Sequence, residues 1–83
     1  MTQRARTAKQ LGAIIRRERR RQGLTQARLG AKIGLRQATV SRLEAGEPAI
    51  QLRTLLDVLT ALNLEIHVAP RGKTSIDELE SLF

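Results

Sequence analysis

Along residues 8–62 the apolar positions recur every three or four residues, which is the spacing of amphipathic helices. Glycine interrupts the pattern at positions 23, 34 and 46, and glycine at such places commonly ends a helix. Four helices are therefore expected, at residues 8–21, 25–32 with Thr25 as the N-cap, 36–45 and 52–62. The pattern predicts an all-α fold.

The pattern changes after the fourth helix, where Leu64, Ile66 and Val68 alternate with other residues before Pro70. A period of two residues is typical of a strand, and it predicts one at residues 64–69. No other part of the chain has a strand pattern, so the backbone groups of this strand lack a partner within one copy. We therefore expect it to pair with the same strand of a second copy across a two-fold axis. The alternative is an irregular segment that lies against the helical domain.

Charge divides the chain into two unlike halves. Residues 1–42 carry twelve Arg or Lys against one acid, Glu18, whereas residues 43–83 carry three against seven. The first half thus has a net charge of +11 and the second of −4. So basic a half is typical of proteins that bind a polyanion, and nucleic acid is the expected partner.

The composition limits what else the chain can be. Its 83 residues suffice for one small domain, and the absence of Cys rules out disulfides and thiolate metal sites. No apolar run reaches the roughly 20 residues that span a bilayer, and the N-terminus lacks the apolar stretch of a secretory signal. We therefore expect a cytoplasmic protein without membrane contact. The single histidine, His67, has no metal-ligand or nucleophile spacing, so we predict no catalytic site, metal or cofactor.

The stretch QARLGAKIGLRQATVSRLEA at residues 26–45 matches the pattern of a helix-turn-helix. Two crossing helices need a small residue where their backbones approach and a glycine in the turn, and Gly30 and Gly34 occupy those places. Apolar residues complete the motif at Leu29, Ile33, Leu35, Val40 and Leu43. A helix-turn-helix within a basic half predicts a sequence-specific DNA-binding protein. Glu44, near the end of the motif, is expected to close the third helix against a nearby arginine.

In such a motif the N-terminal part of the second helix lies in the major groove of double-stranded DNA. The expected base-reading residues are Arg36, Gln37, Ala38, Thr39 and Arg42. Gln37 suits adenine and Arg36 suits guanine, although Arg36 could instead contact phosphate. Phosphate contacts are expected from Thr25, Gln26, Arg28, Ser41, Arg16 and Arg17. For the two arginines of the first helix, an ordinary exposed charged face is the alternative.

The segments LTQARLGAKIG and SRLEAG resemble the LTQ-x-x-L-A and S-x-x-E-x-G signatures of the Cro/CI-type, or Xre, family of bacterial and phage regulators. The resemblance covers residues 11–62 and implies a four-helix, lambda-repressor-like domain. Two positions depart from the family pattern: Gly30 replaces the more usual Ala, and Arg36 stands where many members place a capping Ser. Within the family, IGLRQATVS and LTALNLEIHV are most similar to the HipB-like antitoxins, which repress their own operon and bind a HipA-type kinase toxin.

This resemblance implies that the strand pairs across a homodimer, through Leu64, Glu65, Ile66, His67 and Val68. A DNA-binding domain at residues 8–63 would then lie between a flexible basic arm, residues 1–7, and a flexible tail, residues 70–83. In the tail, Ser75 and Glu78 form a capping box. Its apolar residues could order on a partner: Ile76, Leu79, Leu82 and Phe83. A solvated terminus with incidental leucines is the alternative.

Three functions remain open at this stage. The first is a repressor that is also the antitoxin of a type II toxin–antitoxin pair. The second is a stand-alone Xre-family regulator, or an antitoxin of a ribonuclease toxin. The third is an adaptor that uses the helix-turn-helix for protein contacts only. A neighbouring gene for a HipA-like kinase would separate the first from the second, and binding to upstream DNA would exclude the third.

Overall fold

The computed structural model describes residues 2–72, and this part of the chain contains four helices. They are α1 (Ala8–Arg21), α2 (Gln26–Ile33), α3 (Gln37–Glu44) and α4 (Leu52–Ala61). Their bounds agree closely with the ranges expected from the apolar spacing, which confirms the predicted all-α, four-helix fold.

Side-chain caps and glycine set the ends of these helices. The Thr7 hydroxyl accepts a hydrogen bond from Gln10 N at 3.0 Å, and the Thr25 hydroxyl accepts one from Arg28 N at 3.1 Å. Each satisfies a backbone N–H that the first turn leaves without a helical partner. Gly34 ends α2 in the left-handed conformation with a φ of 68°, which costs glycine little.

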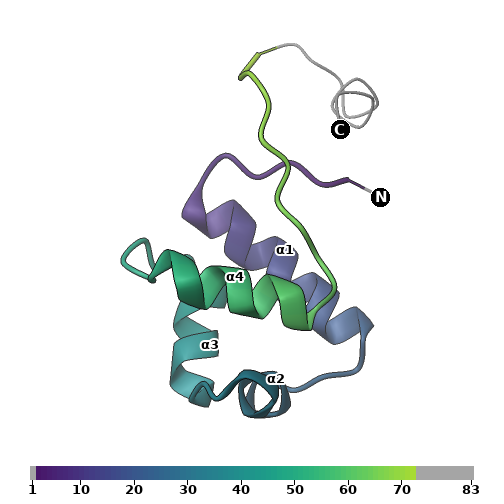
Figure 1. Ribbon diagram of the computed structural model, residues 1–83, viewed down its shortest axis with the longest axis vertical. Helices are drawn as coiled ribbons and strands as arrows, with labels where there is room; N and C mark the ends of the chain where they lie inside the picture. Colours follow the sequence, from purple (N-terminus) through teal and green to yellow (C-terminus); the bar gives the residue numbers. More distant parts are fainter. Residues whose placement is uncertain (1, 73–83) are drawn as a thin grey trace.

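The helices divide the molecule into two parts. In Figure 1, α2 and α3 occupy the lower part, and α1 and α4 lie above them. α2 packs against both α3 and α4, and α3 packs against α1. The two helices of the motif are therefore held from one side by the other two, so that their remaining surface faces solvent.

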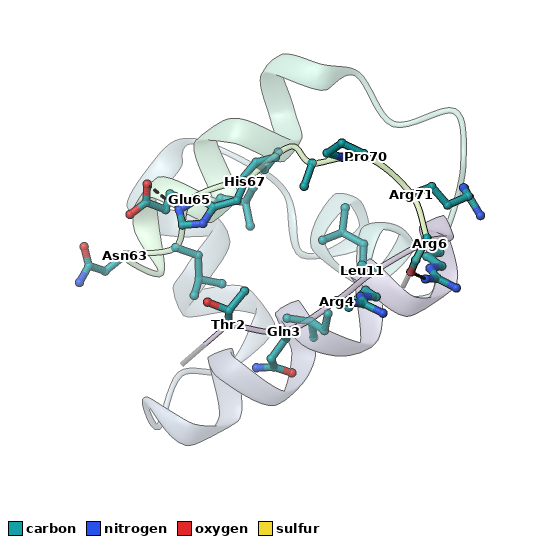
Figure 2. A pocket seen from close by; sticks show the side chains of 17 residues that line it. Thr2, Gln3, Arg4, Arg6, Leu11, Asn63, Glu65, His67, Pro70 and Arg71 are labelled. Atoms are coloured by element: carbon teal, nitrogen blue, oxygen red, sulfur yellow. Dashed lines mark hydrogen bonds and ion pairs between the residues drawn. The ribbon is translucent and has the colours of Figure 1, made fainter. Parts of the chain in front are cut away.

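The two ends of the described chain meet away from α2 and α3. The segment that follows α4 crosses the N-terminal arm, residues 2–6, at the upper end of the molecule in Figure 1. Arg6 Nη2 donates to the Gly72 carbonyl at 3.4 Å, and the two segments line a groove between them (Figure 2). Residues 64–70 are neither helix nor strand in this single chain. A strand requires a bonded neighbour, so the pairing across a dimer stays a prediction, as does the flexibility of the arm.

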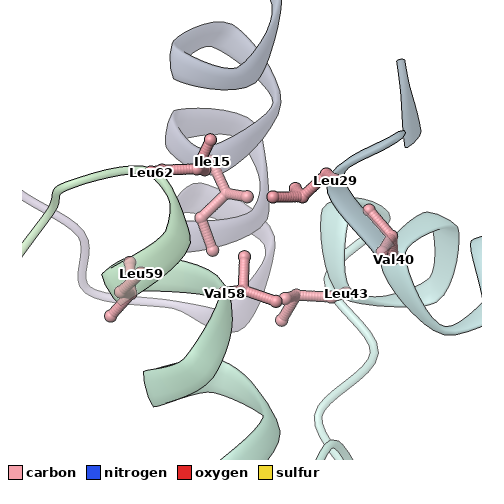
Figure 3. Packing of buried hydrophobic residues seen from close by; sticks show 7 residues of the cluster. All are labelled: Ile15, Leu29, Val40, Leu43, Val58, Leu59 and Leu62. Atoms are coloured by element: carbon pink, nitrogen blue, oxygen red, sulfur yellow. The ribbon is translucent and has the colours of Figure 1, made fainter. Parts of the chain in front are cut away.

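Seven aliphatic side chains form the core, shown in Figure 3: Ile15, Leu29, Val40, Leu43, Val58, Leu59 and Leu62. They come from all four helices and from the residue that ends α4, so each helix is fixed by the others. Leu52 and Leu56 of α4 are 65% and 45% exposed. The apolar face of α4 therefore extends beyond the residues that pack into the core.

Candidate nucleic-acid interface

Glycine allows the two helices of the motif to meet closely. A Cβ added to Gly30 would lie 2.5 Å from the carbonyl oxygen of Leu35, so a side chain there would force the turn to move. The Gly30 carbonyl also accepts a hydrogen bond from Leu35 N at 2.9 Å. Gly30 has low helix propensity, but its small size fixes the path by which the chain leaves α2 and enters α3.

The first turn of α3 presents most of the side chains expected to read bases. Arg36, Gln37 and Ala38 are exposed, as is Arg42 one turn later, whereas Thr39 is half-buried. Arg36 occupies the N-cap of α3 but makes no side-chain capping hydrogen bond. Its guanidinium therefore does not cap the N-terminus of α3. The contacts of these side chains with bases stay predictions.

A series of hydrogen bonds joins this surface to the core. Arg19 of α1 donates to both carboxylate oxygens of Glu44, from Nε to Oε2 at 2.6 Å and from Nη2 to Oε1 at 2.9 Å. Gln26 Nε2 donates to the same Oε1 at 3.1 Å. Gln37 Nε2 then donates to Gln26 Oε1 at 3.5 Å. The first residue of α3 is thus connected through the first residue of α2 to a buried ion pair.

The Arg19–Glu44 pair is almost completely removed from water, with side chains only 8% and 3% exposed. Burial by itself would raise the pKa of Glu44, but hydrogen bonds from Arg19 and Gln26 outweigh it and hold that pKa below its ordinary value. The hydrogen bonds to Glu44 in turn raise the pKa of Arg19, so both groups stay charged. Glu44 therefore closes α3 against an arginine, as expected. That the arginine is Arg19 was not evident, because five arginines lie close together in α1.

We expect the protein to lose stability in acid through this carboxylate. Because the pKa of Glu44 in the folded state lies below its ordinary value of 4.5, the stabilisation is present above that pH and is lost as the pH falls through the folded pKa. Glu44→Gln cannot titrate, so its stability should fall less between about pH 5 and pH 3 than that of the unmodified protein. Thermal unfolding across this range measures the difference, and equal pH slopes would contradict it.

The phosphate-binding candidates of α2 and α3 differ in their surroundings. Thr25 and Arg28 are exposed at the N-terminus of α2, where the helix dipole favours an anion, and Ser41 is exposed on α3. The Thr25 hydroxyl accepts from Arg28 N and still has its own O–H to donate. Gln26 is half-buried, and its amide bonds to Glu44 and Gln37. Its contacts tie α2 to α3.

Arg16 and Arg17 lie on a basic face of α1. With Lys9 and Arg20 they line a groove of about 550 Å³ that reaches Glu44 at the end of α3. Arg17 Nη1 donates to Gln3 Oε1 of the arm at 2.7 Å. The positive charge of Arg16 helps to lower the pKa of Glu44, the carboxylate that holds Gln26. The basic face of α1 therefore adjoins the helix-turn-helix.

The residues expected at a dimer interface follow α4. Leu64 is half-buried, whereas Ile66 and Val68 are 46% and 76% exposed. Glu65 and His67 are also exposed, and His67 Nε2 lies 3.2 Å from Glu65 Oε2. The expected partner-binding residues of the tail, Ile76, Leu79, Leu82 and Phe83, lie outside the described residues.

Comparison with protein families decides the class of this chain. Residues 15–68 match the family model described as helix-turn-helix. The chain belongs to the helix-turn-helix family. It is a DNA-binding transcriptional regulator of the Xre type and not an enzyme. In residues 2–72, no group of three His, Cys, Asp or Glu could hold a metal ion, and no helix is long and apolar enough to cross a membrane.

Two curated relatives are uncharacterized HTH-type transcriptional regulators of Sinorhizobium fredii (strain NBRC 101917 / NGR234). The regulator y4mF is 33% identical over 73 residues, which are 88% of this chain and 96% of y4mF. The regulator y4dL is 40% identical over 57 residues, 69% of this chain. This helix-turn-helix chain spans only 29% of y4dL, so the likeness to y4dL concerns one part of a longer protein.

Solved structures of HipB share the fold. A complex of a HipB variant with an O2 20mer has a TM-score of 0.80 at 30% identity and covers 87% of this chain and all of the HipB chain. A HipA–HipB–O2–O3 complex has a TM-score of 0.79 at 30% identity over 86% of this chain. The helix-turn-helix protein therefore has the HipB fold over most of its length.

Proposed function

We propose that this protein is a sequence-specific repressor that binds double-stranded operator DNA as a homodimer. The observation that carries the proposal is the exposed first turn of α3, in which Gln37 is connected through Gln26 to the buried Arg19–Glu44 pair. A side chain that is already held in place loses less conformational entropy when it binds a base. The likeness to HipB, a variant of which was solved in complex with an O2 20mer, supports the proposal.

The experiment that tests this proposal is the substitution Gln37→Ala. Removing a base contact should weaken binding to the correct operator by about 1–3 kcal/mol and change binding to random DNA little. Gel-shift titrations with both kinds of DNA, at one fixed salt concentration, measure the two affinities. If both affinities fell equally, α3 would not read bases through Gln37.

Two matched variants serve as controls for Gln37→Ala. Arg28→Ala removes an exposed cation at the N-terminus of α2 and should weaken operator and random DNA alike, because phosphate carries no sequence information. Gln10→Ala removes an exposed glutamine from α1, at the end of the helix near the arm, and should leave both affinities unchanged.

The dimer is proposed to form through residues 64–68 and the exposed part of α4. Four apolar side chains support this surface, because they gain nothing from exposure in a single copy: Leu52, Leu56, Ile66 and Val68. Pairing of two extended segments would also give the backbone groups of Ile66 and Val68 hydrogen-bond partners. A two-fold dimer should then recognise an inverted repeat whose half-sites lie about 34 Å apart.

We infer further that the repressor is the antitoxin of a HipA-type kinase toxin. The support is the likeness to HipB in a HipA–HipB–O2–O3 complex, together with the acidic, apolar pattern of residues 74–83. The alternative is a stand-alone regulator, and the likeness to y4mF does not separate the two functions, because y4mF is an uncharacterized HTH-type transcriptional regulator. A kinase gene beside this one whose product copurifies with the repressor would select the first function.

Deleting residues 74–83 tests the role of the tail in that complex. Asp77, Glu78 and Glu80 would be repelled by phosphate, so operator affinity should stay nearly unchanged. Affinity for the purified toxin should fall, or the antitoxin should be degraded at a different rate in cells. If the truncated protein bound the toxin as tightly as the full-length protein, survived as long in cells and repressed equally well, residues 74–83 would not have the proposed function.

A further inference from the structure

A groove of about 780 Å³ lies between the N-terminal arm and the segment after α4, at the end of the molecule away from α2 and α3 (Figures 1 and 2). Leu11 and Ile14 of α1 and Leu59 of α4 give it an apolar part. Three arginines also line it: Arg4, Arg6 and Arg71. Figure 2 shows Arg6 and Arg71 together at one end of the groove.

The lining of this groove has a definite chemical character. Glu65 is the one acid among the described residues that line it, against the three arginines. The groove is therefore positively charged and partly apolar. A DNA backbone would use the charge but not the apolar surface, and the base-reading side chains lie at the other end of the molecule. An acidic, amphipathic protein segment would use both properties.

We propose that the groove binds residues 73–83 of the same chain. These residues contain three acids against one Lys, and their apolar residues recur at Ile76, Leu79, Leu82 and Phe83. The chain enters the segment at the groove itself, because Gly72 is one of the lining residues. Charge, apolar pattern and position along the chain thus match the groove.

The length of the segment also suffices. Eleven residues reach at most about 36 Å when extended, and the principal extents of the described molecule are 37 × 25 × 18 Å. The segment can therefore reach every part of the groove without moving a helix. Because it is attached beside its site, its effective concentration is of millimolar order, so weak ion pairs and a few apolar contacts are enough to hold it.

Docking in this groove has two consequences. It would cover the apolar residues of this segment, and any protein partner of the segment would have to compete with the groove. It does not involve the surface of α3. The inference therefore stands apart from the proposed reading of bases by α3, but it shares residues with the proposed dimer surface, because Leu64, Glu65, Ile66 and His67 also line the groove.

A single tryptophan reports on the docking. The chain contains no Trp, so Phe83→Trp places one fluorophore at the end of the segment. In the full-length protein we expect this Trp to be shielded from acrylamide at about 0.1 M salt and more accessible at about 1 M, where the Debye length falls from about 10 Å to about 3 Å. Shielding should be independent of protein concentration, and shielding that is lost on dilution would overturn docking within one chain.

Charge reversal identifies the groove as the site. Arg4→Glu together with Arg6→Glu should abolish the shielding, whereas Arg53→Glu on α4, which does not line the groove, should preserve it. Adding Glu78→Arg and Glu80→Arg to the variant with Arg4→Glu and Arg6→Glu should restore the shielding. Unchanged helix content and an unchanged thermal unfolding midpoint verify that the variants fold. If acrylamide quenched the Trp equally in the Phe83→Trp protein with and without Arg4→Glu and Arg6→Glu, the proposal would be overturned.

Discussion

Replacing Glu44 with alanine is expected to lower the free energy of unfolding by about 3–5 kcal/mol, because it leaves the Arg19 guanidinium buried without a counter-charge. The side chain of Arg19 is only 8% exposed, so its guanidinium has little contact with solvent water. Small domains have total stabilities of only about 5–15 kcal/mol, so the variant should be close to unfolding. Urea denaturation at a fixed protein concentration measures the change, and a loss below about 1 kcal/mol would contradict a buried, paired charge.

The double substitution Arg19→Met with Glu44→Leu separates stability from DNA recognition. Removing both charges should recover much of the stability that either single substitution loses, because an apolar pair of similar size carries no desolvation penalty. It also removes the carboxylate that accepts the hydrogen bond from Gln26. We therefore expect a stable protein with weakened operator binding. Full operator affinity in the stable double variant would show that the Glu44–Gln26–Gln37 connection does not matter for recognition.

The four helices could be predicted because each buries one face and is ended by local chemistry. Thr25 caps α2, and Gly34 adopts the left-handed conformation that ends it. Gly30 was expected at a close approach of backbones, and the short distance from its added Cβ to the Leu35 carbonyl confirms this. Such features depend on residues that are near one another in the sequence, so the sequence pattern was sufficient to find them.

Other features depend on contacts that a sequence does not display. Arg19 looks like its neighbours in α1, and only the fold brings it to Glu44, which is 25 residues away. Leu52 and Leu56 fit the apolar stripe of α4, but the core of one copy is too small to cover them. The hydrogen bond from Arg6 of the arm to the Gly72 carbonyl joins residues that are 66 positions apart, so the pattern along the chain could not reveal it.

The substitution Ile66→Pro should dissociate the proposed dimer. Proline removes a backbone N–H donor and so is not tolerated where a strand must bond to a neighbour. In the described chain the N–H of Ile66 makes no hydrogen bond, and the last backbone bond before it is from Leu64 N to the Leu59 carbonyl at 2.8 Å. The helical domain of a single copy should therefore remain folded, so that the loss is confined to the interface.

Sedimentation equilibrium should show a monomer for Ile66→Pro and a dimer for Ile66→Val, which keeps both the N–H and a β-branched side chain. Operator affinity should fall by about 10²–10⁴-fold with proline, because the second half-site is no longer bound as an intramolecular step. Binding to a single half-site should be the same in both variants, because α3 is unchanged. A proline variant that remained a dimer would exclude residues 64–68 from the interface and leave the exposed face of α4, with Leu52 and Leu56, as the surface that joins the two copies.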